Sequence, residues 1–181
     1  MQPNIPEPVP FTFHPLSTDD PLLPEWLALY ESAFPQGERF PVETMRTILR
    51  NGEPPCVQML AVLDESGALV GLAVVELREQ LQAMFLWYLA VTPAQRSQGL
   101  GSQIYRRLIA EFGAGCQALV FDVEIPELAV DAVERSLRAR RIEFYRRHGA
   151  RVLSGIDYAI HPSPDDPPVA LHFMVHPLQP L

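Results

Sequence analysis

Apolar residues recur along the chain with two different periods, and these periods predict an alternation of strands and helices. Alternating or continuous apolar runs bounded by turn residues predict strands at 11–14, 57–63, 69–77, 82–91, 118–124, 152–160 and 169–175. Apolar residues three or four positions apart predict helices at 22–33, 42–50, 102–112 and 128–148. The order β-α-α-β-β-β-α-β-α-β-β predicts an α/β protein with a mixed sheet. Because the run 82–91 is almost wholly apolar, we expect a central strand buried on both faces.

Nineteen prolines separate a regular core from two loop-rich ends. Only Pro93 and Pro126 lie between residues 56 and 161. Because proline lacks a backbone N–H and has a fixed φ, it is excluded from the interior of regular elements. The regular core is therefore predicted at roughly 56–160. The whole chain, 1–181, is predicted to be a single domain in which residues 1–10 form a loose arm.

Composition limits the classes of partner and compartment. The chain has 181 residues, is 48% hydrophobic and carries a net charge of −8. That charge argues against nucleic acid and against anionic membrane surfaces as general partners. The longest apolar run, 83–91, is far shorter than a bilayer span, and residues 1–8 lack the features of a signal peptide. We expect a cytoplasmic protein, a monomer or a homodimer, whose two cysteines are free thiols.

The turn between the central strand and the following helix carries the clearest chemical signal. Unpaired N–H groups and the dipole of a helix N-terminus favour an anion at such a turn. Gly99 and Gly101 let the backbone approach a phosphate without a Cβ in the way. The spacing of these glycines, with no lysine after them, argues against a P-loop. Ile104 occupies the place of the third glycine of a dinucleotide fingerprint, which argues against that site too.

Three segments together resemble motifs of the GNAT superfamily of acetyl-CoA-dependent N-acyltransferases. Arg96-Ser97-Gln98-Gly99-Leu100-Gly101 is similar to the R-x-x-G-x-G of its motif A, and Leu89-Ala90-Val91-Thr92-Pro93 to the strand end before it. Phe144-Tyr145-Arg146-Arg147-His148-Gly149 is similar to a second signature, F-Y-x-x-x-G-F, with Ala150 in the last place. The resemblance covers roughly residues 56–160. It implies a GNAT-like fold in which strands 86–91 and 118–124 are parallel and splay apart to admit the pantetheine arm of the cofactor.

The function that this resemblance implies is the transfer of an acetyl group from acetyl-CoA to a primary amine, directly within a ternary complex and without a metal. The acceptor would be a small-molecule or peptide amine, which the sequence does not name. Two alternatives stay open. One is a non-catalytic sensor that binds acyl-CoA, and the other is an enzyme that uses a different phosphate-bearing cofactor.

The needs of thioester aminolysis assign roles to the matching residues. Backbone N–H groups near Leu89, Ala90 and Val91 would stabilise the carbonyl oxygen as it gains charge. The pyrophosphate would be held by Arg96, Ser97, Gln98, Gly99, Leu100, Gly101 and Ser102. Tyr145 matches the tyrosine of the family signature and would protonate the leaving thiolate. The alternative for Tyr145 is a tyrosine packed in the helix with only a structural role.

The general base is less clear than the acid. Some family members carry a glutamate on the central strand near the position of Phe85, which cannot accept a proton. The remaining candidates are Glu124 at the end of the next strand and Glu76 on the hairpin, and Glu124 is better placed. Glu124 could instead be paired with an arginine, and a chain of water could replace any single base.

Two arginines of the long helix are assigned to the cofactor cleft. Arg141 continues an apolar stripe at four-residue spacing, and a guanidinium on a stripe that faces the core needs an anionic partner. A cofactor phosphate, Glu124 or an acceptor carboxylate could be that anion, and Arg138 lies beside it. If the helix twists, Arg141 extends to solvent instead. The stripe consists of Val133, Leu137, Arg141 and Tyr145.

The acceptor would be enclosed by the first two helices, the loop 34–41 and the last hairpin. In that loop Glu38 could hold a cationic amine and Arg39 a carboxylate, or the two could form a surface ion pair of little consequence.

Overall fold

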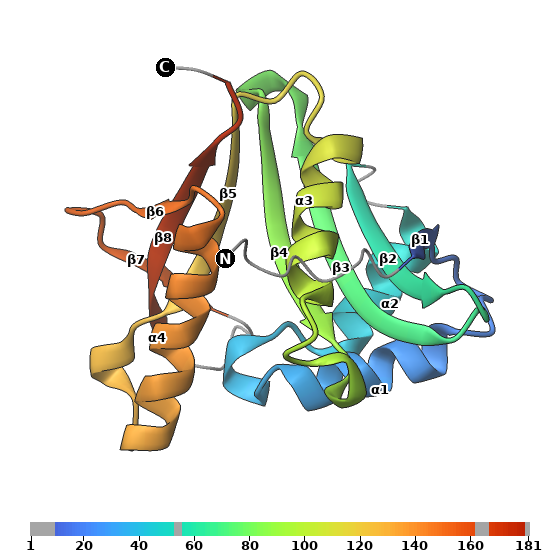
Figure 1. Ribbon diagram of the computed structural model, residues 1–181, viewed down its shortest axis with the longest axis horizontal. Coiled ribbons are helices and arrows are strands. Elements are labelled where there is room, and N and C mark those ends of the chain that lie inside the picture. The colour runs from blue at the N-terminus through green and yellow to red at the C-terminus, as the bar shows by residue number, and fades with distance from the viewer. Residues whose placement is uncertain (1–9, 53–55, 162–166, 180–181) are drawn as a thin grey trace, which may run out of the picture.

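The computed structural model describes residues 10–52, 56–161 and 167–179. In these residues the chain forms one mixed sheet with the order β1-β2-β3-β4-β5-β8-β6, and β7 pairs with β8 (Figure 1). The strands are β1 (Phe11–Pro15), β2 (Val57–Asp64), β3 (Leu69–Arg78), β4 (Ala83–Val91), β5 (Ala118–Glu124), β6 (Arg151–Val152), β7 (Tyr158–Ile160) and β8 (Val169–Pro177). The helices are α1 (Leu23–Ala33), α2 (Val42–Asn51), α3 (Leu100–Phe112) and α4 (Ala132–Arg147). All of the predicted arm except Pro10 lies outside the described residues.

Two apolar clusters cover the two faces of the sheet. One face packs against α3 and α4, whose buried residues are Leu100, Ile104, Tyr105, Leu108, Ile142 and Tyr145. The other face packs against α1 and α2, whose buried residues are Leu23, Trp26, Leu27, Leu29, Tyr30 and Met45. Trp26 can be fully buried because its indole Nε1 donates to the carbonyl oxygen of Leu60 at 3.0 Å. The predicted mixed α/β sheet is therefore confirmed.

The central strands β4 and β5 are parallel for only a short distance. Their pairing extends over three positions, from Ala83 opposite Ala118 to Phe85 opposite Val120, and then stops. In Figure 1 the two strands lie close at one end and diverge toward the other, as the family resemblance implied. On its other edge β4 pairs with β3, but the register shifts because Val74 faces Tyr88 and Val75 faces Leu86. Trp87 is the extra residue of this bulge, and bulges re-aim the side chains that follow.

The prediction that β4 is buried on both faces was wrong. Buried residues alternate with half-buried ones from Ala83 to Tyr88, and Leu89, Ala90 and Val91 are all half-buried. The splay explains the difference, because the strand that would cover this edge of β4 moves away from it after Phe85.

Two other elements differ from their predicted bounds. Helix α4 begins at Ala132 rather than at 128, because Asp131 caps it by accepting the backbone N–H of Glu134. The predicted strand 152–160 is divided into β6 and β7, since Gly155 has a φ of +76° in the turn between them.

Candidate active site

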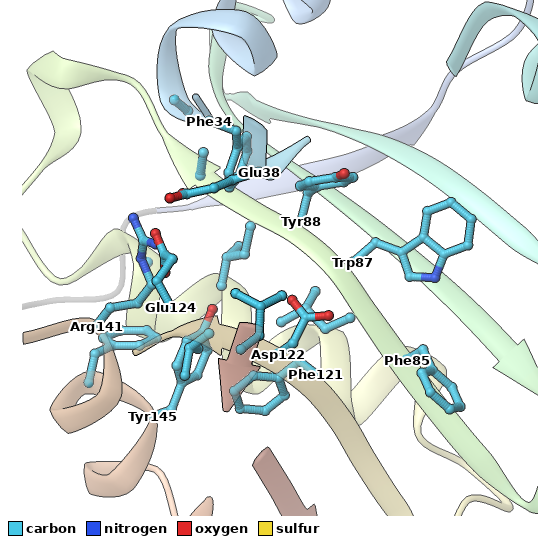
Figure 2. Close-up of a pocket in the computed structure, with 18 of the residues that line it drawn as sticks. Phe34, Glu38, Phe85, Trp87, Tyr88, Phe121, Asp122, Glu124, Arg141 and Tyr145 are labelled. Atoms are coloured by element: carbon cyan, nitrogen blue, oxygen red, sulfur yellow. The ribbon is translucent and has the colours of Figure 1, made fainter. Parts of the chain in front are cut away.

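A cavity of about 780 Å³ opens where β4 and β5 part. Its lining comes from α1 and the loop after it, from β4 and the turn after it, from β5, from α4 and from β7 and β8. Figure 2 shows side chains from these separate elements converging on one space. The cavity therefore exists because β4 and β5 splay apart, and several separate elements form its walls.

The structure brings most of the predicted site residues to this cavity. Those that line it are Leu89, Ala90, Val91, Arg96, Gly101, Glu124, Arg141 and Tyr145. The predicted residues outside the lining are Ser97, Gln98, Gly99, Leu100, Ser102 and Arg138. Apart from Arg138, the residues of this second group belong to the turn at the start of α3, beside Arg96 and Gly101.

The wall formed by β4 presents backbone rather than polar side chains. After Phe85 the edge of β4 that faces β5 has no strand partner. An unpaired strand edge can hydrogen-bond to any extended chain of amides laid beside it. The pantetheine arm of coenzyme A contains two such amide groups, so this wall has the chemistry that the arm requires.

The turn after β4 has the geometry of an anion site. Gly99 caps α3 with a φ of +83°, a conformation that glycine adopts without steric cost. A Cβ built on Gly101 would have only ordinary contacts, 3.9 Å to Phe144 Cε2 and 4.0 Å to Val91 Cγ1. Arg96 lines the cavity and has no ion-pair partner among the described residues. The turn therefore combines a helix N-terminus with an uncommitted guanidinium, which suits a pyrophosphate.

Tyr145 lies at the centre of the cavity floor. Its ring packs against Phe121, with the centroids 4.2 Å apart. Its hydroxyl has no hydrogen-bond partner among the described residues, and Figure 2 shows it directed into the cavity. Burial raises the pKa of Tyr145 to about 12, although the Arg141 guanidinium acts in the opposite direction. The group is therefore protonated at neutral pH and able to donate to a ligand.

Arg141 pairs with Glu124, which is one of the anions considered for it. The guanidinium Nη1 donates to Glu124 Oε1, and Figure 2 shows the two side chains together at one side of the cavity. Burial acts to raise the pKa of Glu124, but the nearby Arg141 outweighs it and the pKa is lowered. The reasoning that led to Arg141 was partly wrong, because Val133 is 70% exposed and lies outside the cavity lining. Leu137 is 51% exposed but lines the cavity with Arg141 and Tyr145, so the predicted stripe faces the cavity from Leu137 onward.

Arg138 is outside the cavity lining and is held by two carboxylates and a backbone carbonyl oxygen. It donates to Glu38 Oε1 at 3.3 Å, to Glu134 Oε1 at 2.6 Å and to the carbonyl oxygen of Ile125 at 3.1 Å. Burial and the neighbouring Glu124 raise the pKa of Glu38 to about 7. The ion pair between Arg138 and Glu38 connects α4 to the loop after α1 across the cavity mouth.

Two further candidates have structural partners. Glu76 is 4% exposed and accepts from Arg78 Nε at 2.5 Å and from Trp87 Nε1 at 3.0 Å. Arg39 donates to the carbonyl oxygen of Phe34 and to Glu31, both at 3.1 Å. Glu76 lines the cavity, whereas Arg39 does not. Both side chains therefore already have hydrogen-bond and ion-pair partners within the protein.

The sequence analysis missed Asp122. This residue lies on β5 and lines the cavity, and it accepts a hydrogen bond from the Tyr158 hydroxyl at 3.2 Å. Burial raises its pKa to about 6. The alternation of β5 could have identified it, because the residue two positions before Glu124 points to the same face of the strand.

In residues 10–52, 56–161 and 167–179 no cluster of three or more His, Cys, Asp and Glu side chains is arranged to hold a metal. Within those ranges no helix has both the length and the apolarity needed to cross a bilayer.

Comparison with solved structures shows what the fold is similar to. A protein described as an acetyltransferase of the GNAT family from Bacteroides thetaiotaomicron superposes with a TM-score of 0.75 at 22% identity, covering 93% of this chain and 88% of that one. A GNAT acetyltransferase from Elizabethkingia anophelis with acetyl-CoA bound has a TM-score of 0.61 at 14% identity, covering 93% and 98%. The dodecameric spermidine N-acetyltransferase of Vibrio cholerae has a TM-score of 0.64 at 12% identity, covering 92% and 93%.

Comparison by sequence gives a consistent result. No curated protein matches the chain. The sequence model of the GNAT acetyltransferase family matches residues 23–150, which span α1 to the end of α4 and include the turn after β4, Glu124 and Tyr145. This match covers well over half of the chain, and the splayed strands and the cavity agree with it. The protein therefore belongs to the GNAT family of acetyltransferases.

Proposed function

We propose that this protein transfers an acetyl group from acetyl-CoA directly to a primary amine held in the same cavity. The observation that carries the proposal is a cavity bounded by the β4 edge, by a turn suited to an anion and by the Tyr145 hydroxyl, with the edge and the hydroxyl both unpaired among the described residues. Acetyl-CoA supplies the thioester, and the residues of the chain bind it, orient it and move the protons.

In this proposal the cofactor contacts are divided between backbone and charge. The backbone of Leu89, Ala90 and Val91 pairs with the pantetheine arm and offers N–H groups to the thioester oxygen. Arg96 and the turn from Ser97 to Ser102 hold the pyrophosphate. The support for this division is the free edge of β4 and the guanidinium of Arg96, which has no carboxylate partner among the described residues.

Tyr145 has the role of the general acid. A coenzyme A thiol has a pKa near that of cysteine, about 8.5, so its thiolate leaves more readily when a proton is supplied. The raised pKa of Tyr145 keeps its proton in place until charge develops on sulfur. The nearby Arg141 then favours the transient tyrosinate, and this is how we assign Arg141 to the cofactor side of the cleft.

Glu124 and Arg138 act through Arg141 and Glu38 in this scheme. Because Glu124 is paired with Arg141, it is better suited to orienting that guanidinium than to accepting a proton. Arg138 holds Glu38 at the cavity mouth. The acceptor itself is a primary amine of a small molecule or a peptide that enters between the loop 34–41 and β7.

The alternative function, a sensor that binds acyl-CoA without turnover, is separated from this proposal by a two-part experiment. Calorimetric titration with acetyl-CoA, ATP and NAD should give binding for acetyl-CoA alone. A thiol-release assay with a panel of amines should then show turnover that depends on the amine. Tight acetyl-CoA binding with no turnover for any amine would favour the sensor.

A further inference from the structure

Four carboxylates line the cavity, and three of them already have a cationic partner. Glu38 is paired with Arg138, Glu76 with Arg78 and Glu124 with Arg141. The fourth, Asp122, has no arginine or histidine within ion-pair distance among the described residues. Its recorded partner is the neutral hydroxyl of Tyr158.

A carboxylate in such a position lacks the compensation that burial normally requires. Taking an ionised carboxyl out of water is costly unless a cation or several hydrogen bonds replace the lost hydration. Asp122 is half-buried and has no cation beside it in the part of the chain that the structure describes. Partial removal from water therefore raises its pKa to about 6, and the carboxylate form at neutral pH is poorly satisfied. An ammonium ion in the cavity would supply the missing partner.

Asp122 and Tyr145 lie on opposite faces of β5. Phe121 and Val123 point to the face covered by α3 and α4, where Tyr145 packs. Alternation along the strand directs Asp122 to the other face, toward Tyr88, whose pKa its charge helps to raise. The two groups are nevertheless close enough for Asp122 to help raise the pKa of Tyr145. A thioester in the splay would therefore have the tyrosine on one face and the aspartate on the other.

The position of Asp122 along β5 also suits contact with an ammonium ion in the cavity. It lies two residues beyond Val120, where the pairing of β4 with β5 stops. A ligand whose phosphates occupy the turn after β4 must extend back along β4 toward that closed end. Asp122 thus lies deeper in the splay than Glu124, at the end where the reactive group of such a ligand would be.

From these observations we infer that Asp122 binds the ammonium form of the acceptor and accepts its proton, with Tyr158 as the positioning residue that orients the carboxylate. This inference rests on the proposed function and names the residue that fixes the acceptor in it. The recognised acceptor is a monocationic primary amine whose body contacts the aromatic and aliphatic wall made by Phe34, Tyr88 and Phe173.

The protons and bonds balance in this scheme. The ammonium gives its first proton to Asp122, which passes it to solvent, and the neutral nitrogen forms a bond to the acyl carbon. The carbon–sulfur bond then breaks as the Tyr145 hydroxyl donates its proton to sulfur. The nitrogen loses its second proton as the amide forms, and this proton restores Tyr145. The products are the acetylated amine, the free thiol and one proton released to solvent.

The test compares Asp122→Asn with the wild type, using acetyl-CoA and three acceptors. Phenylethylamine and butylamine are monocationic ammonium ions at pH 7, whereas methoxyamine is largely neutral. With the ammonium acceptors, Asp122→Asn should lower kcat/KM by about 10²- to 10⁴-fold, as expected for a lost general base. With methoxyamine the loss should be much smaller, because the first proton is already absent. The acetyl-CoA Kd from calorimetry should stay within about threefold.

Two further variants separate the chemical role from a structural one. Asp157→Asn makes the same change at an exposed position beside Tyr158 and should behave as the wild type. Tyr158→Phe removes a hydrogen bond that lowers the pKa of Asp122, so the acidic limb of the pH profile of kcat/KM should move above about 6. A merely structural aspartate would slow all three acceptors equally and leave that limb in place.

The outcomes are distinguishable from a failure of the proposed function. If the wild type releases thiol with none of the acceptors, the proposed acetyl transfer is overturned, and the role of Asp122 with it. If the wild type is active and Asp122→Asn retains its rate and its pH limb, the inference about Asp122 alone is overturned. A loss seen in Glu124→Gln or Glu38→Gln but not in Asp122→Asn would assign the proton to that residue instead.

Discussion

The two strands that bound the cavity, β4 and β5, differ in what they offer a ligand. Strand β4 presents an unpaired backbone edge and half-buried apolar side chains such as Phe85 and Leu89. Strand β5 presents two carboxylates, Asp122 and Glu124, on one face and a packed Phe121 on the other. A backbone edge can pair with the amides of any extended chain, whereas a carboxylate selects by charge. The comparison supports the proposal that β4 binds the cofactor through its backbone and that β5 selects the acceptor through its side chains.

The largest expected effect concerns Tyr145 on α4, the proposed general acid, which packs against β5. Tyr145→Phe keeps the ring packed on Phe121 and removes only the hydroxyl. We expect kcat to fall by about 10²- to 10⁴-fold, because a general acid is lost. The acetyl-CoA Kd should be nearly unchanged. Stopped-flow or steady-state thiol release measures the first quantity and calorimetry the second. Normal turnover across the pH range would show that the hydroxyl is structural.

The next prediction tests whether the β4 side binds through its backbone. Gly101→Val adds a Cβ that would have only ordinary contacts with the protein, so we expect the substitution to act mainly on the ligand. Losing one charge-assisted hydrogen bond costs about 1.5–3 kcal/mol, so the acetyl-CoA Kd should rise by about 10- to 100-fold. Gly37→Ala is the matched control, since a Cβ at Gly37 meets no atom within 4 Å. Gly99 is unsuitable for this test, because its positive φ would add backbone strain. An unchanged Kd for Gly101→Val would show that the phosphates of the cofactor do not bind at this turn.

A smaller effect is expected in stability at the cavity mouth. The pKa of Glu38 is about 7 in the folded protein against 4.5 in a model peptide, so folding favours its protonated form. Its contribution to stability is full below about pH 4.5 and is lost as the pH rises through about 7. Glu38→Gln keeps the neutral form at all pH values. Relative to the wild type, its free energy of unfolding should gain about 1–2 kcal/mol between pH 4.5 and 8.

Denaturant unfolding at the two pH values measures this gain, and the exposed Glu43 provides the control variant Glu43→Gln. An equal difference between Glu38→Gln and the wild type at both pH values would mean that folding leaves the pKa of Glu38 unchanged. In that case the effect of burial and of Glu124 on the pKa of Glu38 would have to be abandoned.

The smallest effect is predicted at the exposed end of α4. Val133 is 70% exposed, so Val133→Ser should change the free energy of unfolding by less than about 0.5 kcal/mol. The acetyl-CoA Kd should also be unchanged. Both results are expected because Val133 is not among the residues that line the cavity. A loss of more than about 1 kcal/mol would show that this face of α4 is covered in solution.

Much of the fold follows from patterns that are local in the sequence. The periods of apolar residues predicted the order of the helices and most strands, and the segment from the central strand to Gly101 predicted a glycine-bearing turn into a helix, which the structure contains. Tyr145 was found because it belongs to a short motif. In each case the pattern extends over only a few neighbouring positions, so it can be recognised in the sequence alone.

Other features could not be predicted in this way. The pattern of β4 indicated burial on both faces, because sequence does not record where β5 moves away from it. The predicted stripe failed at Val133 because a helix can extend past the groups that its other turns contact. Asp122 was missed because its importance depends on having no cation nearby, which is a property of residues distant in the chain.

The sequence by itself determined the elements, their order, the turn that suits a phosphate and the tyrosine that suits a leaving thiolate, because local periodicity and short motifs encode them. Only the tertiary structure decided which charges are paired. It joins Arg141 to Glu124, Arg138 to Glu38 and Arg78 to Glu76, whereas no cation of the described segments pairs with Asp122. The physical reason is that the energy of a buried charge depends on every group within a few ångströms, whatever the separation in sequence.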